Sequence, residues 1–174
     1  YQTHPWSLTG GGAGETQIII AERAGGTLGD IAPVIGRMMH TACDDAYFAP
    51  LQSWNRFLGD DKWSIGVVEG EFVRDWGLEV KTGCVFPYTS ELEPTRNVPD
   101  LNLLSVLWPN KTILRNRREP NGFQEEIGLT WYEWSRFQKE RFSSRIAISF
   151  AEVASHNHFA LDRGDKVFKQ TAPI

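Results

Sequence analysis

Glycine and proline residues are spread along much of this sequence, so most of the helices and strands that it can form are short. The 174 residues include 16 glycines and 9 prolines, and both residue types end regular elements. The longest apolar runs, such as residues 18–21, fall far below the roughly 20 residues that a membrane helix needs. Because 41% of the residues are hydrophobic, the chain can still bury a core. We therefore predict an α+β fold: a curved, mostly antiparallel sheet of short strands with a few short helices.

Hydrophobic periodicity places the predicted elements along the chain. We expect helices at 15–23, 28–32 and 129–145, strands beginning at 34–36 and covering 63–73, 80–86 and 146–153 (the last one buried), and a β-hairpin of 159–161 and 166–168 around a turn at 162–165. The helix at 129–145 has the clearest signal, because Trp131, Trp134 and Phe137 recur at intervals of three to four residues. Thr130 and Glu133 would form its capping box.

Domain boundaries follow from composition. Residues 1–26 are predicted to be a linker or arm, because residues 10–14 are rich in glycine, and residues 27–174 are predicted to be one domain. Since residue 1 is not Met, we expect a piece of a longer chain whose domain is truncated at its C-terminal end. Two cysteines, Cys43 and Cys84, are too few for a disulfide scaffold, and no signal peptide is recognisable. The predicted location is the cytoplasm.

The net charge of −4 hides a division between an acidic and a basic part of the chain. On the whole-chain charge, a generic basic nucleic-acid binder is disfavoured. Residues 1–104, however, contain 7 basic and 14 acidic residues, whereas residues 105–174 contain 11 basic and 8 acidic residues. Such asymmetry indicates a polyanion partner for the basic part. The alternative is that these charges are the solvated faces of ordinary elements.

Basic and aromatic residues alternate between 108 and 145, a pattern typical of a surface that binds nucleic acid. Arginine binds phosphates and guanine edges, and aromatic rings stack on bases. We expect Trp131, Trp134 and Phe137 to belong to the core rather than to this surface. Arginines 115, 117 and 118 are expected on a loop in contact with a partner.

Metal and catalytic sites have weaker signals. His156 and His158 lie two residues apart, so on a strand they would share one face, as two metal ligands could. No third ligand has an obvious spacing, and such histidines more often bind backbone or phosphate. We therefore predict no metal site.

A second candidate is a Mg²⁺-dependent nuclease centre at Glu79 and Lys81, with Asp60 or Asp61 upstream. The Glu-x-Lys tripeptide is common by chance, and the preceding Pro-Asp is missing. No Gly-x-Ser-x-Gly motif is present, and neither cysteine has the context of a nucleophile. No catalytic residue is predicted.

Several segments resemble DNA adenine methyltransferases of restriction and phage-defence systems. Residues 28–36 (LGDIAPVIG) resemble the start of a target-recognition domain, as in TaqI-like enzymes and Type I specificity subunits. Residues 41–48 (TACDDAYF) resemble the Thr-Gly-x-x-x-x-Phe stretch that follows, with Ala42 in place of glycine, and residues 67–76 resemble a later turn. The longest similar segments are 129–134 (LTWYEW) and 148–168 (ISFAEVASHNHFALDRGDKVF), together with 4–12 (HPWSLTGGG), which resemble Type IIG and BREX-like enzymes.

The resemblance implies a module that recognises double-stranded DNA and packs on the catalytic domain of the same enzyme. The Asn-Pro-Pro-Tyr motif and the glycine-rich loop for S-adenosylmethionine are both missing from these 174 residues. We therefore expect no cofactor in this chain, and S-adenosylmethionine in the implied larger enzyme. The predicted DNA-binding residues are Lys111, Arg115, Arg117, Arg118, Tyr132, Arg136, Lys139, His156, His158, Arg163 and Lys166. The alternatives are a protein–protein docking module of the same enzyme and the divergent nuclease described above.

Overall fold

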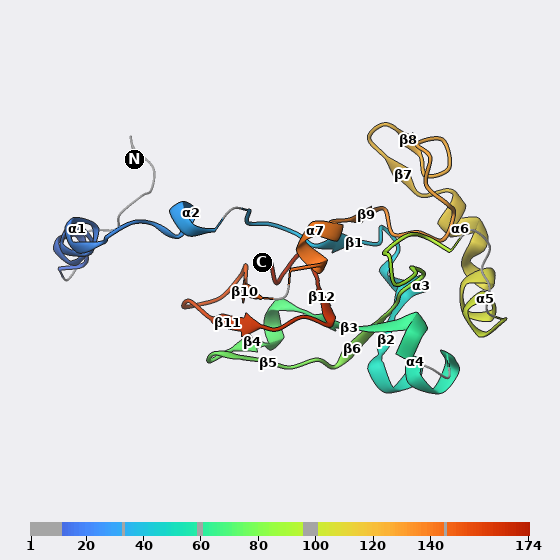
Figure 1. Ribbon diagram of the computed structural model, residues 1–174, viewed down its shortest axis with the longest axis horizontal. Coiled ribbons are helices and arrows are strands. Elements are labelled where there is room, and N and C mark those ends of the chain that lie inside the picture. Colours follow the sequence, from blue (N-terminus) through green and yellow to red (C-terminus); the bar gives the residue numbers. More distant parts are fainter. Residues whose placement is uncertain (1–11, 33, 59–60, 96–100, 145) are drawn as a thin grey trace. The chain divides into compact units, whose positions relative to one another are not determined.

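The computed structural model describes residues 12–32, 34–58, 61–95, 101–144 and 146–174 (Figure 1). It divides the chain into two compact units, one up to Ile35 and one from Gly36 to Ile174. The first unit contains α1 (Ala13–Arg23) and α2 (Leu28–Ile31), both expected from the sequence, and α1 buries none of its residues. At the start of α2, the backbone N–H and the hydroxyl of Thr27 both donate to the Asp30 carboxylate. The predicted boundary after residue 26 stays a prediction.

A four-stranded sheet organises the second unit, in the order β12-β3-β6-β2 (Figure 1). Its strands are β2 (Phe48–Pro50), β3 (Ser64–Val68), β6 (Thr82–Val85) and β12 (Lys166–Phe168). β6 pairs antiparallel with β2 and β3, and β12 pairs parallel with β3. Helix α4 (Leu51–Leu58) packs on β6, where a Cβ at Gly83 would lie 2.9 Å from the Leu51 and Trp54 side chains. Gly83 thus allows the helix to approach the strand.

Four antiparallel two-stranded sheets complete the described strands. They pair β1 (Met39–His40) with β9 (Arg136–Phe137), β4 (Val73–Arg74) with β5 (Gly77–Leu78), β7 (Arg118–Glu119) with β8 (Gly122–Phe123), and β10 (Ala147–Phe150) with β11 (Phe159–Asp162). The remaining helical segments are α3 (Asp44–Tyr47), α5 (Leu101–Leu107), α6 (Lys111–Arg115), α7 (Lys139–Phe142) and the 3-10 turns η1 (Asp61–Trp63), η2 (Gly70–Phe72) and η3 (Trp108–Asn110). Short helices with mostly antiparallel sheets confirm the predicted α+β fold. None of the helices in the described part of the chain is long and apolar enough to cross a membrane.

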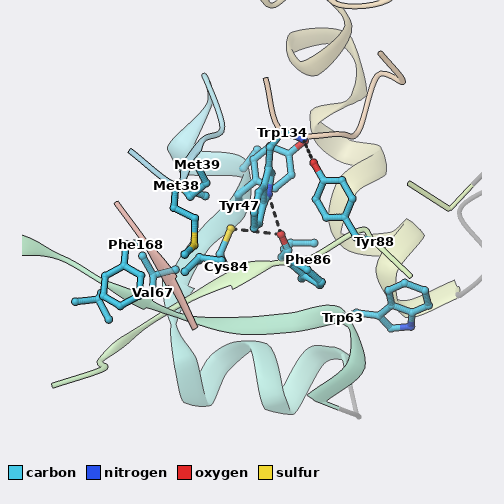
Figure 2. Packing of buried hydrophobic residues seen from close by; sticks show 14 of the residues in the cluster. Met38, Met39, Tyr47, Trp63, Val67, Cys84, Phe86, Tyr88, Trp134 and Phe168 are labelled. Atoms are coloured by element: carbon cyan, nitrogen blue, oxygen red, sulfur yellow. Dashed lines mark hydrogen bonds between the residues drawn. The ribbon is translucent and has the colours of Figure 1, made fainter. Parts of the chain in front are cut away.

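Aromatic rings fill the core of the second unit. Four aromatic rings surround Phe86, with centroids 5.2–5.9 Å from its own: those of Tyr88, Trp134, Phe137 and Phe142. Figure 2 shows Trp134 beside Tyr88, and its indole N–H donates to the Val85 carbonyl at 3.1 Å. The expectation that Trp131, Trp134 and Phe137 pack in the core is confirmed, because Trp134 is 1% exposed and the other two are half-buried against the core.

The predicted helix at 129–145 is wrong. Residues 129–135 are irregular, residues 136–137 form β9, and only Lys139–Phe142 is helical. One half of the predicted capping box nevertheless exists, since the Thr130 N–H donates to the Glu133 carboxylate at 2.5 Å. The local signal was therefore real, but the following backbone does not continue as a helix.

Three strand predictions also need correction. Residues 34–36 form no strand, and the side chains of Val34 and Ile35 are exposed. The strand predicted as buried at 146–153 is β10, and of its four residues only Ser149 is buried. The predicted hairpin of 159–161 and 166–168 does not form, because β11 pairs with β10 and β12 pairs with β3.

Candidate nucleic-acid interface

The predicted DNA-binding residues fall into a buried set and an exposed set. Arg117, Tyr132 and His158 are buried, whereas the remaining eight are exposed or half-buried. Most of the exposed ones come from α6, β7, β9 and α7. His156, Arg163 and Lys166 come from β12 and the segments that follow β10 and β11, which Figure 1 shows apart from α6 and β7.

Arg117 is bound by backbone carbonyls inside the second unit. Its side chain follows the end of α6, is 5% exposed and donates to four carbonyl oxygens. Nε donates to Leu114 at 2.9 Å, Nη1 to Thr41 at 2.5 Å, and Nη2 to Trp131 at 2.8 Å and Glu133 at 2.7 Å. These contacts use every nitrogen of the guanidinium, so Arg117 offers no free fork to a phosphate.

Two more side chains bind the carbonyls of the irregular segment 129–135. The Gln124 amide donates to Glu133 at 2.7 Å and to Thr130 at 3.3 Å, and the Tyr47 hydroxyl donates to Tyr132 at 2.9 Å. We call this set of donors and carbonyls, centred on Arg117, the carbonyl cluster. A buried carbonyl without a partner costs about 1–3 kcal/mol. The carbonyl cluster therefore stabilises a backbone that has no helical hydrogen bonds of its own.

Burial dominates the ionisation of the phenols around this cluster. It raises the pKa of Tyr47 far above the usual phenol range, although the Arg117 charge opposes the shift. It also raises the pKa of Tyr132, whose hydroxyl is buried and makes no hydrogen bond that meets geometric criteria. Neither phenol ionises at neutral pH. Tyr132 is 3% exposed, so its ring is not accessible for stacking on a base.

Five basic side chains remain on the outside of this region and form what we call the outer basic face: Lys111, Arg115, Arg118, Arg136 and Lys139. Three of them make ion pairs, Arg115 with Glu125 at 2.7 Å, Arg136 with Glu119 at 2.8 Å and Lys139 with Glu93 at 2.7 Å. The basic partners are 38–56% exposed at the side chain. Exposed ion pairs of this kind contribute little stability, about 0.2–1 kcal/mol, and a phosphate oxygen can replace the carboxylate.

Aromatic rings hold the two other cations of the outer basic face. The Lys111 ammonium lies 3.9 Å from the centroid of Trp108 and 5.3 Å from that of Trp131. The Arg118 guanidinium lies 5.8 Å from the centroid of Phe123, on the facing strand β8. No ion pair involves either cation in the described part of the chain, so both retain charge that a polyanion can use.

The second group of predicted residues is less uniform. Lys166 makes an ion pair with the buried Asp162 at 2.5 Å, which closes the turn before β12. Arg163 is exposed on that turn. His156 and His158 lie together, with ring centroids 4.2 Å apart, and Asp75 lies beside them. The sequence analysis missed Asp75, because about 80 residues separate it from the histidines.

The nuclease alternative gains no support from geometry. Glu79 and Lys81 are both exposed and pair with each other at 3.1 Å. Asp60 and the side chain of Asp61 lie outside the described residues. Within the described ranges, three side chains that could bind a metal ion do come together, but they are Asp75, His156 and His158 and not Glu79.

A hollow of about 460 Å³ lies beside the segment 41–48 that resembles target-recognition domains. Its lining includes Cys43, Asp44 and Lys169, and the Lys169 ammonium contacts Asp44 at 3.1 Å and Glu69 at 3.3 Å. Burial lowers the pKa of Lys169, but the two carboxylates outweigh it and the net pKa is raised. The lysine is therefore a fixed charge between two acids, rather than a free contact for DNA.

Sequence comparison relates the whole chain to part of a larger protein. No family model matches the chain. The whole chain is 29% identical, over 175 residues, to the adenine-specific methyltransferase PglX of Streptomyces coelicolor. This similarity associates the chain with an adenine-specific methyltransferase. The chain spans 14% of the length of that relative, so the match concerns one region of a much larger protein.

Proposed function

We propose that this chain is the region of an adenine-specific DNA methyltransferase that recognises double-stranded DNA, and that the outer basic face contacts the duplex. The observation that carries the proposal is the match of the entire chain to one region of PglX. The missing Asn-Pro-Pro-Tyr motif and cofactor loop are consistent with a region that does not catalyse methyl transfer. In this proposal, S-adenosylmethionine and the flipped adenine bind to the catalytic domain.

The chemistry of the outer basic face suits the phosphate backbone. Arg115, Arg118 and Arg136 present planar guanidinium groups on one helix end and two short strands. A phosphate can accept two hydrogen bonds from such a group. On binding, Arg115 would exchange Glu125 for a phosphate, which costs little because both side chains of this pair are exposed. Arg136 would bind a phosphate with its exposed side, because its partner Glu119 is only 10% exposed at the side chain. Arg117 is not part of the proposed contact, and its role is to hold segment 129–135, which leads into Arg136.

Salt dependence of DNA binding tests the proposal. The experiment titrates the 174-residue chain with duplex DNA at two salt concentrations and compares it with the triple variant Arg115→Ala, Arg118→Ala, Arg136→Ala. Each lost phosphate contact reduces the slope of log affinity against log salt by about 0.9. We expect weaker binding and a slope smaller by about 2–3. Arg56→Ala, an exposed arginine at the end of α4, is the matched control and should leave the slope unchanged.

Two outcomes would contradict the proposal. One is a chain that binds DNA with the same slope in the wild type and the triple variant, which would place the contact elsewhere. The other is a folded chain that shows no salt-dependent affinity for duplex DNA. That result would favour the second candidate, a docking module within the same enzyme.

The docking module is supported by exposed apolar side chains in the same region. Trp108, Ile113, Phe123 and Ile127 are each 37–61% exposed on η3, α6, β8 and the following turn. Large exposed apolar side chains are typical of protein–protein contacts when they gather in one patch. The two candidates differ in one measurement, because an apolar docking surface predicts partner binding that changes little with salt.

A further inference from the structure

Three side chains with metal-binding atoms meet at the ends of two hairpins. Asp75 comes from the turn between β4 and β5, and His156 and His158 come from the segment between β10 and β11. One ligand atom from each residue lies within 4.8 Å of the other two. This set was not predicted, because the sequence offered two histidines and no third ligand at a recognisable spacing.

Backbone geometry fixes Asp75 beside the histidines. Asp75 and Trp76 are the two turn residues between β4 and β5, and both have positive φ, 47° and 70°. This is the backbone of a tight hairpin turn, in which Asp is tolerated and a bulky residue is strained. Trp76 also forms a parallel bridge with Ala160 of β11. The bridge holds the turn against the strand that begins next to His158.

Two acceptor atoms face each other in this group. Nδ1 of His158 accepts a hydrogen bond from the Asp75 backbone N–H at 3.4 Å, a long and therefore weak contact that a metal ion on Nδ1 would replace. The same Nδ1 lies 3.7 Å from the Asp75 carboxylate. A cation bound between Nδ1 and this carboxylate oxygen would be attracted to both atoms. His158 is buried, so water screens this attraction less well than on an open surface.

We propose that Asp75, His156 and His158 bind one divalent transition-metal ion of the Zn²⁺ class. Imidazole and carboxylate together select borderline metals such as Zn²⁺, whereas Mg²⁺ and Ca²⁺ prefer oxygen ligands alone. Zinc–ligand bonds of about 2.0–2.1 Å require ligand atoms about 3.3 Å apart in a tetrahedron. The 3.7 Å separation of Nδ1 and the carboxylate is close to that value.

Small side-chain rotations complete the coordination. Asp75 and His156 are exposed and free to turn about their side-chain bonds, while the buried His158 is fixed. The Ser155 hydroxyl lies 3.0 Å from Nδ1 of His156 and orients that ring, as outer partners of metal-binding histidines commonly do. Water would fill the fourth position. The ion would join the β4–β5 turn to the segment after β10, and this role does not depend on the proposed DNA contact.

Metal titration of the purified 174-residue chain tests this site. Zn²⁺ binding is measured in competition with a chromophoric chelator, and Co²⁺ binding by its visible d–d absorption. We expect one equivalent of either metal per chain and a rise in Tm on binding. Asp75→Asn, which retains the turn, and His156→Ala should each weaken binding at least tenfold and remove the Tm rise. Both residues are exposed, so both variants should fold.

Matched controls are Asp165→Asn, an exposed aspartate that also has positive φ, and His40→Ala, a histidine outside the group. Both should bind metal as the wild type does. The proposal is overturned if the wild-type chain takes up no stoichiometric metal, or if Asp75→Asn and His156→Ala bind it as tightly as the controls. DNA binding is measured in a separate experiment. A negative metal titration therefore overturns the metal site alone and says nothing against the proposed DNA contact.

Discussion

Arg117 and Arg118 are neighbours in the sequence, yet they belong to two regions with different chemistry. Arg117 is buried in the carbonyl cluster, where four backbone oxygens accept its hydrogen bonds. Arg118 is exposed on β7, with the Phe123 ring beside its guanidinium. The difference shows that a run of basic residues need not form one basic surface. Here Arg117 stabilises an irregular segment, whereas Arg115 and Arg118 are exposed at the surface.

The largest expected difference in stability is between two single variants in which each arginine is replaced by methionine. Arg117→Met removes the donors for four carbonyls and should lower the free energy of unfolding by about 4 kcal/mol. Arg118→Met should change it by less than about 0.5 kcal/mol, because its side chain is exposed. Urea unfolding at pH 7 measures both. Equal losses of stability in the two variants would mean that the hydrogen bonds of Arg117 do not stabilise the carbonyl cluster. If Arg117→Met does not fold, Arg117→Lys, which retains some of the donors, replaces it in the comparison.

Alkaline pH should destabilise the buried phenols in and around the carbonyl cluster, whereas the arginines of the outer basic face keep their charge. Burial raises the pKa of Tyr47 and of Tyr88 well above the usual value of about 10. For each phenol, the pKa in the folded chain lies above the pKa in the unfolded chain. The free energy of unfolding is therefore unaffected by these phenols below a pH of about 10, and it falls as the pH rises from there toward the folded pKa. The expected loss is about 1.4 kcal/mol per pH unit for each phenol. Arginine stays protonated throughout this range.

Unfolding in urea between pH 7 and pH 11 measures this loss. Tyr47→Phe should be less stable than the wild type at pH 7, since the Tyr132 carbonyl loses its donor. Above pH 10 the variant should lose stability less steeply, because one titrating phenol is gone. An identical slope in both proteins would show that Tyr47 ionises normally in the fold.

The sequence predicted three core positions of segment 129–137, but neither the burial of Tyr132 nor the path of the backbone. The three- to four-residue spacing of Trp131, Trp134 and Phe137 identified core positions correctly, and it was attributed to a helix. The donors that replace helical hydrogen bonds come from Tyr47, Arg117 and Gln124. Such long-range partners have no local signature, so periodicity alone could not exclude the helix.

The hairpin predicted around residues 162–165 shows the same limit. The turn is well formed, since the Asp162 carboxylate accepts from the Gly164 N–H at 2.9 Å and from Lys166 at 2.5 Å. The strands on either side nevertheless separate, one to β10 and the other to β3. Turn residues determine the local reversal, whereas strand partners depend on which apolar faces the whole unit buries. The Asp75, His156 and His158 group was missed for the same reason.

A smaller effect should come from Ala42, which lies next to a carbonyl of the cluster. Ala42 has φ of 56°, in the left-handed region that glycine favours, and it follows Thr41, whose carbonyl accepts from Arg117. The resembled target-recognition pattern has glycine at this position. Ala42→Gly should therefore raise the free energy of unfolding by about 0.5–1 kcal/mol, which is the strain relieved less the added freedom of the unfolded chain.

Ala49→Gly in β2 is the matched control for this change. Ala49 has ordinary extended backbone in the strand paired with β6, so glycine there only adds freedom to the unfolded chain. That variant should lose about 0.5–1 kcal/mol in the same urea experiment. Opposite signs at the two alanines would locate the strain at Ala42, beside the Thr41 carbonyl that Arg117 binds. A lower free energy of unfolding in both variants would mean that the backbone at Ala42 is not strained. The Thr41 carbonyl would then reach Arg117 without a cost in backbone conformation.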